Sequence, residues 1–205
     1  SFVAWVPSQQ SLAFINEGTA KTTTTWIAGP ARLGDDAPAG RVSAAIAGTD
    51  TSLHVAYLTD DGALWHASRL AGKWQRAHVV VVPKQAPGNS LAIARWNGGV
   101  AIAFDDRNSG RIGFAHRPAS LQPGADWTLE WIEPPKQPAQ IDFAGRLAIS
   151  AFQSKIALAT YDRIGRDLYV ATRNNGKWSA VVVAGRNTAT SEDTTDAGMP
   201  CAMTR

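Results

Sequence analysis

Short apolar runs separated by polar turns dominate this chain. The runs are rich in Val, Ile, Ala, Phe and Tyr, and Gly, Asn, Asp and Pro stand between them. This punctuation is typical of β-strands joined by tight turns. No long segment carries the apolar stripe at i, i+3, i+4 and i+7, preceded by a capping residue, that would predict an amphipathic helix. The pattern therefore predicts an all-β protein.

The runs recur in the same order in three successive units. Each unit has a first apolar run, a second run, an acidic turn, a third run that ends in arginine, and a tryptophan that precedes a fourth run. The first runs are Val42–Ala47, Leu91–Trp96 and Leu147–Phe152, the second are Val55–Tyr57, Ile102–Phe104 and Leu158–Thr160, the third are Leu64–Arg69, Ile112–Arg117 and Leu168–Arg173, and the tryptophans are Trp74, Trp127 and Trp178.

A weaker fourth copy opens the chain. It has the runs Phe2–Val6 and Leu12–Ile15, a polar turn, and then Trp26. The tryptophans are separated by 48, 53 and 51 residues along the chain. A period near fifty residues with four strands in each unit predicts β-propeller blades. Neighbouring blades must stack, because one blade alone leaves both of its faces exposed.

The N-terminal copy lacks its first strand, and the C-terminus supplies a candidate for it. Pro200–Arg205 follows an Ala-Gly pair, as the first runs of two other copies do. A ring closed by pairing the first and last strands would leave no open edge. We therefore expect a propeller of about four blades, each a four-stranded antiparallel sheet, in one domain spanning residues 1–205. The alternative is a larger ring completed by a second chain or by further copies of this one.

Bulk composition excludes few classes of protein. With 205 residues and 44% apolar composition, the chain can bury a sizeable core. The net charge is only +3, and the basic residues are spread singly, which does not favour nucleic-acid binding. No apolar run approaches the length of a membrane span. Cys201, the single cysteine, excludes an internal disulfide framework. A start at Ser1 and strand-like sequence at both ends predict processed ends, as in secreted, cell-surface or periplasmic proteins.

The turn before two of the tryptophans resembles a known repeat. Ala171–Trp178 (ATRNNGKW) and Ala67–Trp74 (ASRLAGKW) are similar to degenerate Asp-box repeats, the bacterial neuraminidase repeat with the pattern Ser/Thr-x-Asp-x-Gly-x-Thr-Trp. The Ser/Thr, Gly and Trp positions match, whereas Asn174 and Leu70 replace the aspartate and the threonine before Trp is missing. The resemblance implies a turn between the third and fourth strands of a propeller blade. It also implies a sialidase-like, other glycosidase or lectin-like binding protein.

The repeated tryptophans and arginines are interpreted as structural. Glycine in the turn permits positive φ, and the tryptophan that follows covers the edge of the blade with apolar surface. Three arginines invite comparison with the sialidase arginine triad, but they occupy one equivalent position in each blade. This recurrence favours arginines that cover aromatic faces. The residues concerned are Trp26, Trp74, Trp127, Trp178, Arg69, Arg117 and Arg173.

The acidic turns between second and third strands are the candidate ligand site. Ligands of propellers usually meet the face formed by these turns and by the loops between blades. Carboxylates and arginines there can bind sugar hydroxyls, although hairpin turns also favour aspartate for conformational reasons alone. The predicted ligand-binding residues are Asp60, Asp61, Asp105, Asp106, Arg107, Asp162 and Arg163.

A non-enzymatic propeller that binds carbohydrate is the first functional hypothesis. A sialidase-like glycoside hydrolase is the second, with Asp106 and Asp162 as candidates for the two facing carboxylates that hydrolysis requires. A structural or protein-interaction propeller, one part of a two-chain assembly, is the third. Polar features recur blade by blade, which favours binding over catalysis, so no catalytic residue is assigned. No metal site is predicted from the histidine spacing, and calcium on the clustered aspartates stays an alternative.

Overall fold

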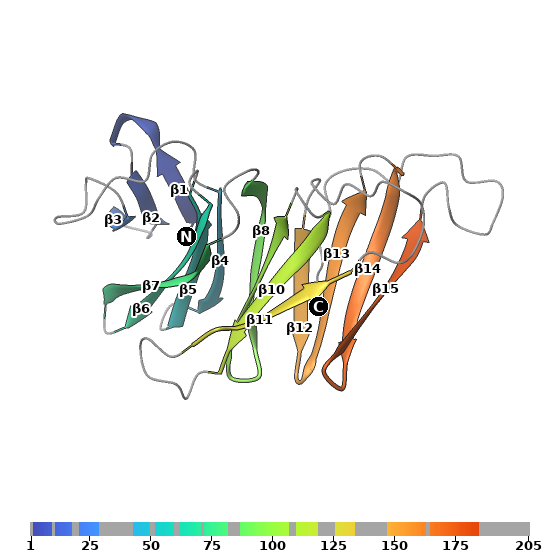
Figure 1. Cartoon of the computed structure of the whole chain (residues 1–205). Helices are drawn as coiled ribbons and strands as arrows, with labels where there is room; N and C mark the ends of the chain where they lie inside the picture. The colour runs from blue at the N-terminus through green and yellow to red at the C-terminus, as the bar shows by residue number, and fades with distance from the viewer. Residues whose placement is uncertain are drawn as a thin grey trace. The chain divides into compact units, whose positions relative to one another are not determined.

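Nearly all regular elements in the described part of this protein are β-strands. The computed structural model describes residues 2–9, 11–17, 21–28, 43–49, 52–59, 62–70, 72–81, 87–106, 110–118, 126–133, 147–162 and 165–184. Within them, the helical element is one 3₁₀ turn, η1 (Pro7–Gln9), and the other elements are strands (Figure 1). The prediction of an all-β chain is therefore confirmed.

Within the described residues, the strands form four antiparallel sheets, each of which follows the chain as a simple meander. Three of the sheets have four strands, and the N-terminal sheet has three. Sheet A contains β1 (Phe2–Val6), β2 (Ser11–Glu17) and β3 (Thr22–Ala28). Sheet B contains β4 (Ser43–Thr49), β5 (Ser52–Leu58), β6 (Ala63–Leu70) and β7 (Lys73–Val81). Sheet C contains β8 (Pro87–Trp96), β9 (Gly99–Asp106), β10 (Arg111–Arg117) and β11 (Thr128–Ile132), and sheet D contains β12 (Leu147–Phe152), β13 (Lys155–Asp162), β14 (Asp167–Asn174) and β15 (Lys177–Ala184).

These sheets correspond to the four sequence repeats. The described residues of each predicted run lie in a strand, and three of the repeated tryptophans lie at or near the start of a fourth strand. Trp26 lies instead in the last strand of sheet A, which lacks a first strand among the described residues, as the sequence predicted. The segment expected to supply that strand, Pro200–Arg205, lies outside the described residues, and so does Cys201.

The chain divides into two compact units, residues 1–87 and 88–205. In the first unit, Leu12, Phe14 and Ile27 of sheet A pack with Val55, Tyr57, Ala67 and Trp74 of sheet B. In the second unit, Ala101, Ala103 and Phe114 of sheet C pack with Leu158, Tyr169 and Ala171 of sheet D. Within each unit, one sheet therefore buries an apolar face against the next sheet. The prediction of one domain over residues 1–205 stays a prediction.

Glycines shape the hairpins that the sequence pattern marked. Gly72 and Gly176, which lie in the turns between the third and fourth strands just before Trp74 and Trp178, both have φ of 79°. Asn175 has φ of 48°, so Asn175-Gly176 forms the two-residue turn with two positive φ angles that suits the twist of a hairpin. The expected role of the turn glycine is confirmed.

Candidate functional site

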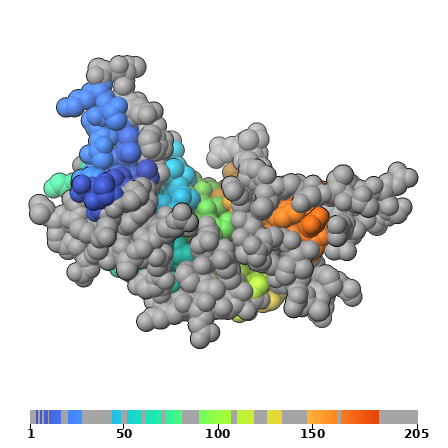
Figure 2. Space-filling model, turned by 90° about the horizontal axis from the view of Figure 1, so that it is seen from above, coloured from blue at the N-terminus to red at the C-terminus, as the bar shows by residue number. Residues whose placement is uncertain are grey.

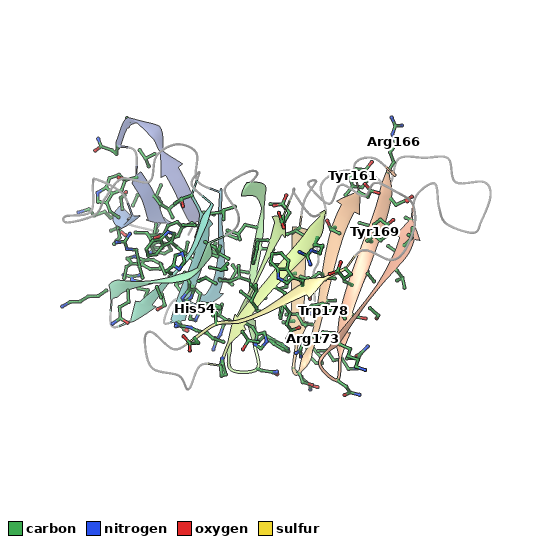
Figure 3. The ribbon with its side chains drawn as sticks, viewed as in Figure 1. His54, Tyr161, Arg166, Tyr169, Arg173 and Trp178 are labelled. Atoms are coloured by element: carbon green, nitrogen blue, oxygen red, sulfur yellow. The ribbon has the colours of Figure 1, made fainter. Side chains whose placement is uncertain are left out.

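Polar side chains gather at both ends of the contact between sheets C and D. Side chains alternate along a strand, and the face of sheet D that packs on sheet C carries Leu158 and Ala171 near its middle. On this same face, Asp162 and Tyr169 lie towards one end, and Arg173 and Trp178 lie at the other. Figure 3 shows the separation between Tyr169 and the pair Arg173 and Trp178. We call the two groups the acidic end and the Glu130 end.

The acidic end connects sheets C and D through a buried hydrogen-bond chain. The backbone N–H of Ser90 donates to Oδ1 of Asp105 at 2.9 Å, and the backbone N–H of Leu147 donates to the Ser90 hydroxyl at 2.6 Å. Asp105 is at the end of β9, and Leu147 begins β12. Asp105 is 1% exposed, so its carboxylate belongs to the packed interior of the unit. Through this bond, Asp105 holds the backbone of Ser90 at the start of the hydrogen-bond chain.

Two more carboxylates of the acidic end lie against a turn. Asp162 and Asp167 face each other across β13 and β14, and both are fully buried. A Cβ atom built on Gly165 would lie 2.5 Å from Oδ2 of Asp162 and 3.0 Å from Oδ2 of Asp167. Glycine at this position therefore lets both carboxylates pack directly on the backbone of the turn. The three acidic residues Asp105, Asp162 and Asp167 define the acidic end.

Tyr169 responds electrostatically to these carboxylates. Burial raises the pKa of its phenol, and the negative charges of Asp167 and then Asp162 raise it further, to about 12. Both causes favour the neutral phenol, because a phenolate would be desolvated and would face two carboxylates. Tyr169 is thus a neutral side chain across the physiological pH range.

The predicted ligand-binding residues do not form one group in the structure. Asp105 and Asp162 lie on the faces of sheets C and D that pack together, but alternation along β9 puts Asp106 on the opposite face of sheet C. Of the two carboxylates of the hydrolase hypothesis, Asp162 therefore faces sheet C, whereas Asp106 faces away from sheet D. Sequence reasoning missed Asp167 and Tyr169, although a third strand that begins with aspartate opposite Asp162 was a visible signal. Outside the described residues lie Asp60, Asp61, Arg107 and Arg163.

At the Glu130 end, one carboxylate accepts four hydrogen-bond contacts. Arg173 donates through Nε to Oε2 at 2.9 Å and through Nη2 to Oε1 at 2.7 Å. The indole N–H of Trp178 donates to Oε2 at 2.8 Å, and Nε2 of His116 lies 3.2 Å from Oε1. A carboxylate offers about four lone-pair positions, so Glu130 is saturated by its own neighbours. It ties β11 of sheet C to β14 and β15 of sheet D.

The pKa of Glu130 reflects this arrangement. Burial raises the pKa, but the hydrogen bonds from Arg173, Trp178 and His116 and the charge of Arg173 lower it more, so the net shift is below the usual 4.5. The stabilisation that this carboxylate gives is therefore complete above its unfolded pKa and is lost as the pH falls through the folded value. An ionised, saturated carboxylate is a structural tie and has no acceptor position left for a ligand.

The repeated arginines cover aromatic rings. The guanidinium carbon of Arg69 lies 5.5 Å from the ring centroid of Phe14, and that of Arg173 lies 5.3 Å from Trp96. Arg117 lies over Trp127 in the same way, at 5.2 Å. The structural interpretation of these arginines is confirmed. The indole N–H of Trp178 donates to the carboxylate of Glu130.

Sheet B carries a pair of histidines. Nδ1 of His54 lies 3.1 Å from Nε2 of His66, and the two rings stack with centroids 5.3 Å apart. The Ser52 hydroxyl lies 3.3 Å from Nε2 of His54, which is labelled in Figure 3. The two histidines therefore contact each other between the neighbouring strands β5 and β6. Among the described residues, no three or more His, Cys, Asp or Glu side chains are grouped so as to hold a metal ion.

Three solved structures are similar to this chain. The SapL1 lectin in complex with alpha methyl fucoside matches with a TM-score of 0.55 and 12% identity, over 84% of this chain and 55% of that one. The fucose-specific lectin from Aleuria aurantia matches with a TM-score of 0.51 and 15% identity, over 87% of this chain and 55% of that one. AofleA from Arthrobotrys oligospora matches with a TM-score of 0.53 and 12% identity, over 83% of this chain and 49% of that one. No protein-family model and no curated protein matches the sequence.

The comparison establishes the fold. At this level of identity the similarity concerns architecture, and the architecture is a β-propeller built of four-stranded antiparallel sheets, as the sequence predicted. The chain spans about half the length of the structures that it matches. Within the described residues, no helix has the length and apolar character needed to cross a membrane.

Proposed function

We propose that this chain is a non-enzymatic, lectin-like propeller that binds carbohydrate. The observation that carries the proposal is the shared fold over 83–87% of the chain with three solved structures. Two of these are lectins, one named as fucose-specific and the other in complex with a fucoside. The blade-by-blade recurrence of polar residues in this sequence supports binding over catalysis for the same fold.

We place the ligand at the edge of the second unit that carries the turns after β9 and β13. In the turn between β13 and β14, the buried carboxylates of Asp162 and Asp167 lie against Gly165. Arg166, at the tip between β13 and β14, is exposed and extends away from sheet D (Figure 3). A guanidinium presents several N–H donors in a fixed plane, which suits the hydroxyls of a sugar. The predicted residues Asp60, Asp61, Arg107 and Arg163 belong to the same class of turn.

A glycan array followed by calorimetric titration tests the proposal. We expect binding to a defined set of glycans, and methyl fucoside is the first soluble probe to titrate. Replacing Arg163 and Arg166 together by alanine should weaken binding by at least roughly tenfold, because charge-assisted hydrogen bonds are lost. The matched control is the double variant Lys155→Ala, Lys177→Ala, which removes two charges at the opposite end of sheet D. Absence of binding to every glycan on the array would overturn the function, and equal affinities of both variants would overturn the placement.

We also propose that the turns before Trp74 and Trp178 are degenerate Asp-box turns. The equal φ angles of Gly72 and Gly176 and the cross-strand pairing of arginine with tryptophan in both copies support this. Such turns close the hairpin between the third and fourth strands of a blade, so they stabilise the fold and leave binding to the opposite edge.

A further inference from the structure

The face of sheet C that points away from sheet D carries a charged row at its edge. Alternation along β10 places Arg111 on this face, because Ile112 packs against sheet D. Arg111 pairs with Asp106 on β9. On its other side, Glu133 follows β11 and accepts a hydrogen bond from Nη1 of Arg111 at 3.2 Å. A guanidinium therefore lies between two carboxylates, at the edge that carries the turn after β9.

An aromatic pair lies beside this row. In the next row of the same face, Gly113 lies between Phe104 on β9 and Trp131 on β11. A Cβ atom on Gly113 would overlap Cζ of Phe104, so glycine leaves the space that the Phe104 ring fills. The Trp131 ring meets the Phe104 ring edge-on, with centroids 5.8 Å apart, and the guanidinium carbon of Arg111 lies 4.8 Å from the Trp131 centroid. These contacts fix Trp131 and Arg111 relative to each other.

These side chains are the same in kind as those of the Glu130 end, but they are not saturated. Among the described residues, Glu133 accepts one hydrogen bond, from Arg111, whereas Glu130 accepts four contacts. A carboxylate offers about four lone-pair positions and a guanidinium several N–H donors, so both groups keep most of their capacity. The side chain of Glu133 is 68% exposed and that of Arg111 is 35% exposed, so both meet solvent. Figure 2 shows residues of sheet C, in green to yellow, at the molecular surface.

The exposed groups match the hydroxyls of a neutral saccharide. A hydroxyl donates one hydrogen bond and accepts others, so one sugar hydroxyl can donate to Glu133 while its neighbour on the ring accepts from Arg111. The half-buried Trp131 offers apolar surface beside them for the C–H groups of the ring. Two carboxylates flank the one guanidinium, which disfavours an anionic ligand.

We propose that Arg111, Glu133 and Trp131 form a binding site for a neutral saccharide, in which two adjacent hydroxyls contact the guanidinium and the carboxylate. This inference rests on the proposed carbohydrate-binding function and names contact residues that the proposed function leaves open. Asp106 is only 5% exposed and lies opposite Arg111. We therefore assign it to orienting the guanidinium and not to contact with the sugar.

Titration of tryptophan fluorescence with methyl fucoside, a neutral sugar with adjacent hydroxyls, tests this site. Trp131→Phe keeps an aromatic ring against Phe104 and should remove the fluorescence change that wild type shows, whereas Trp65→Phe in the first unit should keep it. Arg111→Gln should shift the midpoint of the change to an about tenfold higher sugar concentration, because a charge-assisted hydrogen bond is lost. The matched control is Arg76→Gln, whose guanidinium carbon lies 5.6 Å from the Trp65 centroid, and its midpoint should equal that of wild type.

Glu133→Gln is a second variant that should fold, since the side chain is exposed and the exchange keeps its shape. It should shift the midpoint about fivefold, because an amide oxygen accepts weaker hydrogen bonds than a carboxylate does. Glucuronic acid should bind more weakly than methyl fucoside, because its negative charge would lie beside two carboxylates.

Two outcomes would overturn this site and leave the proposed function intact. One is a wild-type midpoint in both Arg111→Gln and Glu133→Gln. The other is a fluorescence change that persists in Trp131→Phe, or that wild type lacks although it binds glycans on the array. A chain that binds no glycan on the array would overturn both proposals, so the two failures are distinguishable.

Discussion

The two ends of the contact between sheets C and D accommodate carboxylates in different ways. At each end, carboxylates lie where two apolar sheets meet. Glu130 is about one-fifth exposed and is saturated by Arg173, Trp178 and His116. Asp162 and Asp167 are fully buried and lie against the backbone of a turn. The first arrangement fastens two sheets together, and the second fixes the shape of a loop.

This difference distinguishes polar residues that stabilise the fold from polar residues that could bind a ligand. A carboxylate that already accepts four hydrogen bonds cannot accept more from a sugar. Arg and Trp side chains beside it are therefore not evidence of a sugar site. Carboxylates that fix the backbone of a turn instead determine what the exposed tip of that turn presents to solvent. Substitutions at each end test this distinction.

The largest effect is expected at the Glu130 end. Glu130→Ala leaves Arg173 and Trp178 partly buried without their acceptor, and we expect a loss of about 3 kcal/mol in the free energy of unfolding. Urea denaturation at pH 7 measures it. The control is Glu133→Ala, which breaks the exposed 3.2 Å ion pair with Arg111 and should cost less than about 0.5 kcal/mol. Equal losses in the two variants would show that Glu130 does not tie the sheets together.

A smaller effect is expected at the acidic end. Gly165→Ala introduces a Cβ within 2.5 Å of Asp162 Oδ2, and because that carboxylate is fully buried it cannot move away freely. We expect a loss of about 2 kcal/mol, measured in the same denaturation experiment. Gly98→Ala is the control, because no atom lies within 4 Å of the new Cβ. Its φ of 72° strains an alanine, and we expect this strain alone to lower the free energy of unfolding by about 1 kcal/mol. A Gly165 variant as stable as wild type would mean that the carboxylates do not pack on this turn.

Much of the fold could be predicted from the sequence because it is repeated. A fifty-residue period with tryptophans at fixed places specifies strand order, and turn glycines specify hairpins such as Asn175-Gly176. The stacking of arginines on aromatic rings could also be predicted, since it recurs at one position. Periodicity averages over copies, so even the weak N-terminal copy was recognised.

The candidate site could be predicted only in part, because it depends on differences between copies. Which of Asp105 and Asp106 faces sheet D is decided by strand register, and one residue of register reverses the face. The grouping of Glu130 with Arg173 joins two blades, and no pattern within one repeat predicts it. Asp167 was overlooked because it opens a strand and does not lie in the turn itself.

The smallest effect is expected from Tyr169 and appears only in alkaline solution. Its folded pKa is about 12 against 10.0 for the unfolded chain, so the stability from the neutral phenol is complete below pH 10 and is lost as the pH rises through 12. At pH 11 the loss for this one group is about 1.4 kcal/mol. Tyr169→Phe removes the phenol, so wild type should lose more stability than the variant between pH 9 and pH 11 by about that amount. Urea denaturation of both proteins at the two pH values measures the difference, in which all other ionisations cancel. Parallel pH dependence of the two proteins would mean that neither burial nor the neighbouring carboxylates raise the pKa of Tyr169 in the folded chain.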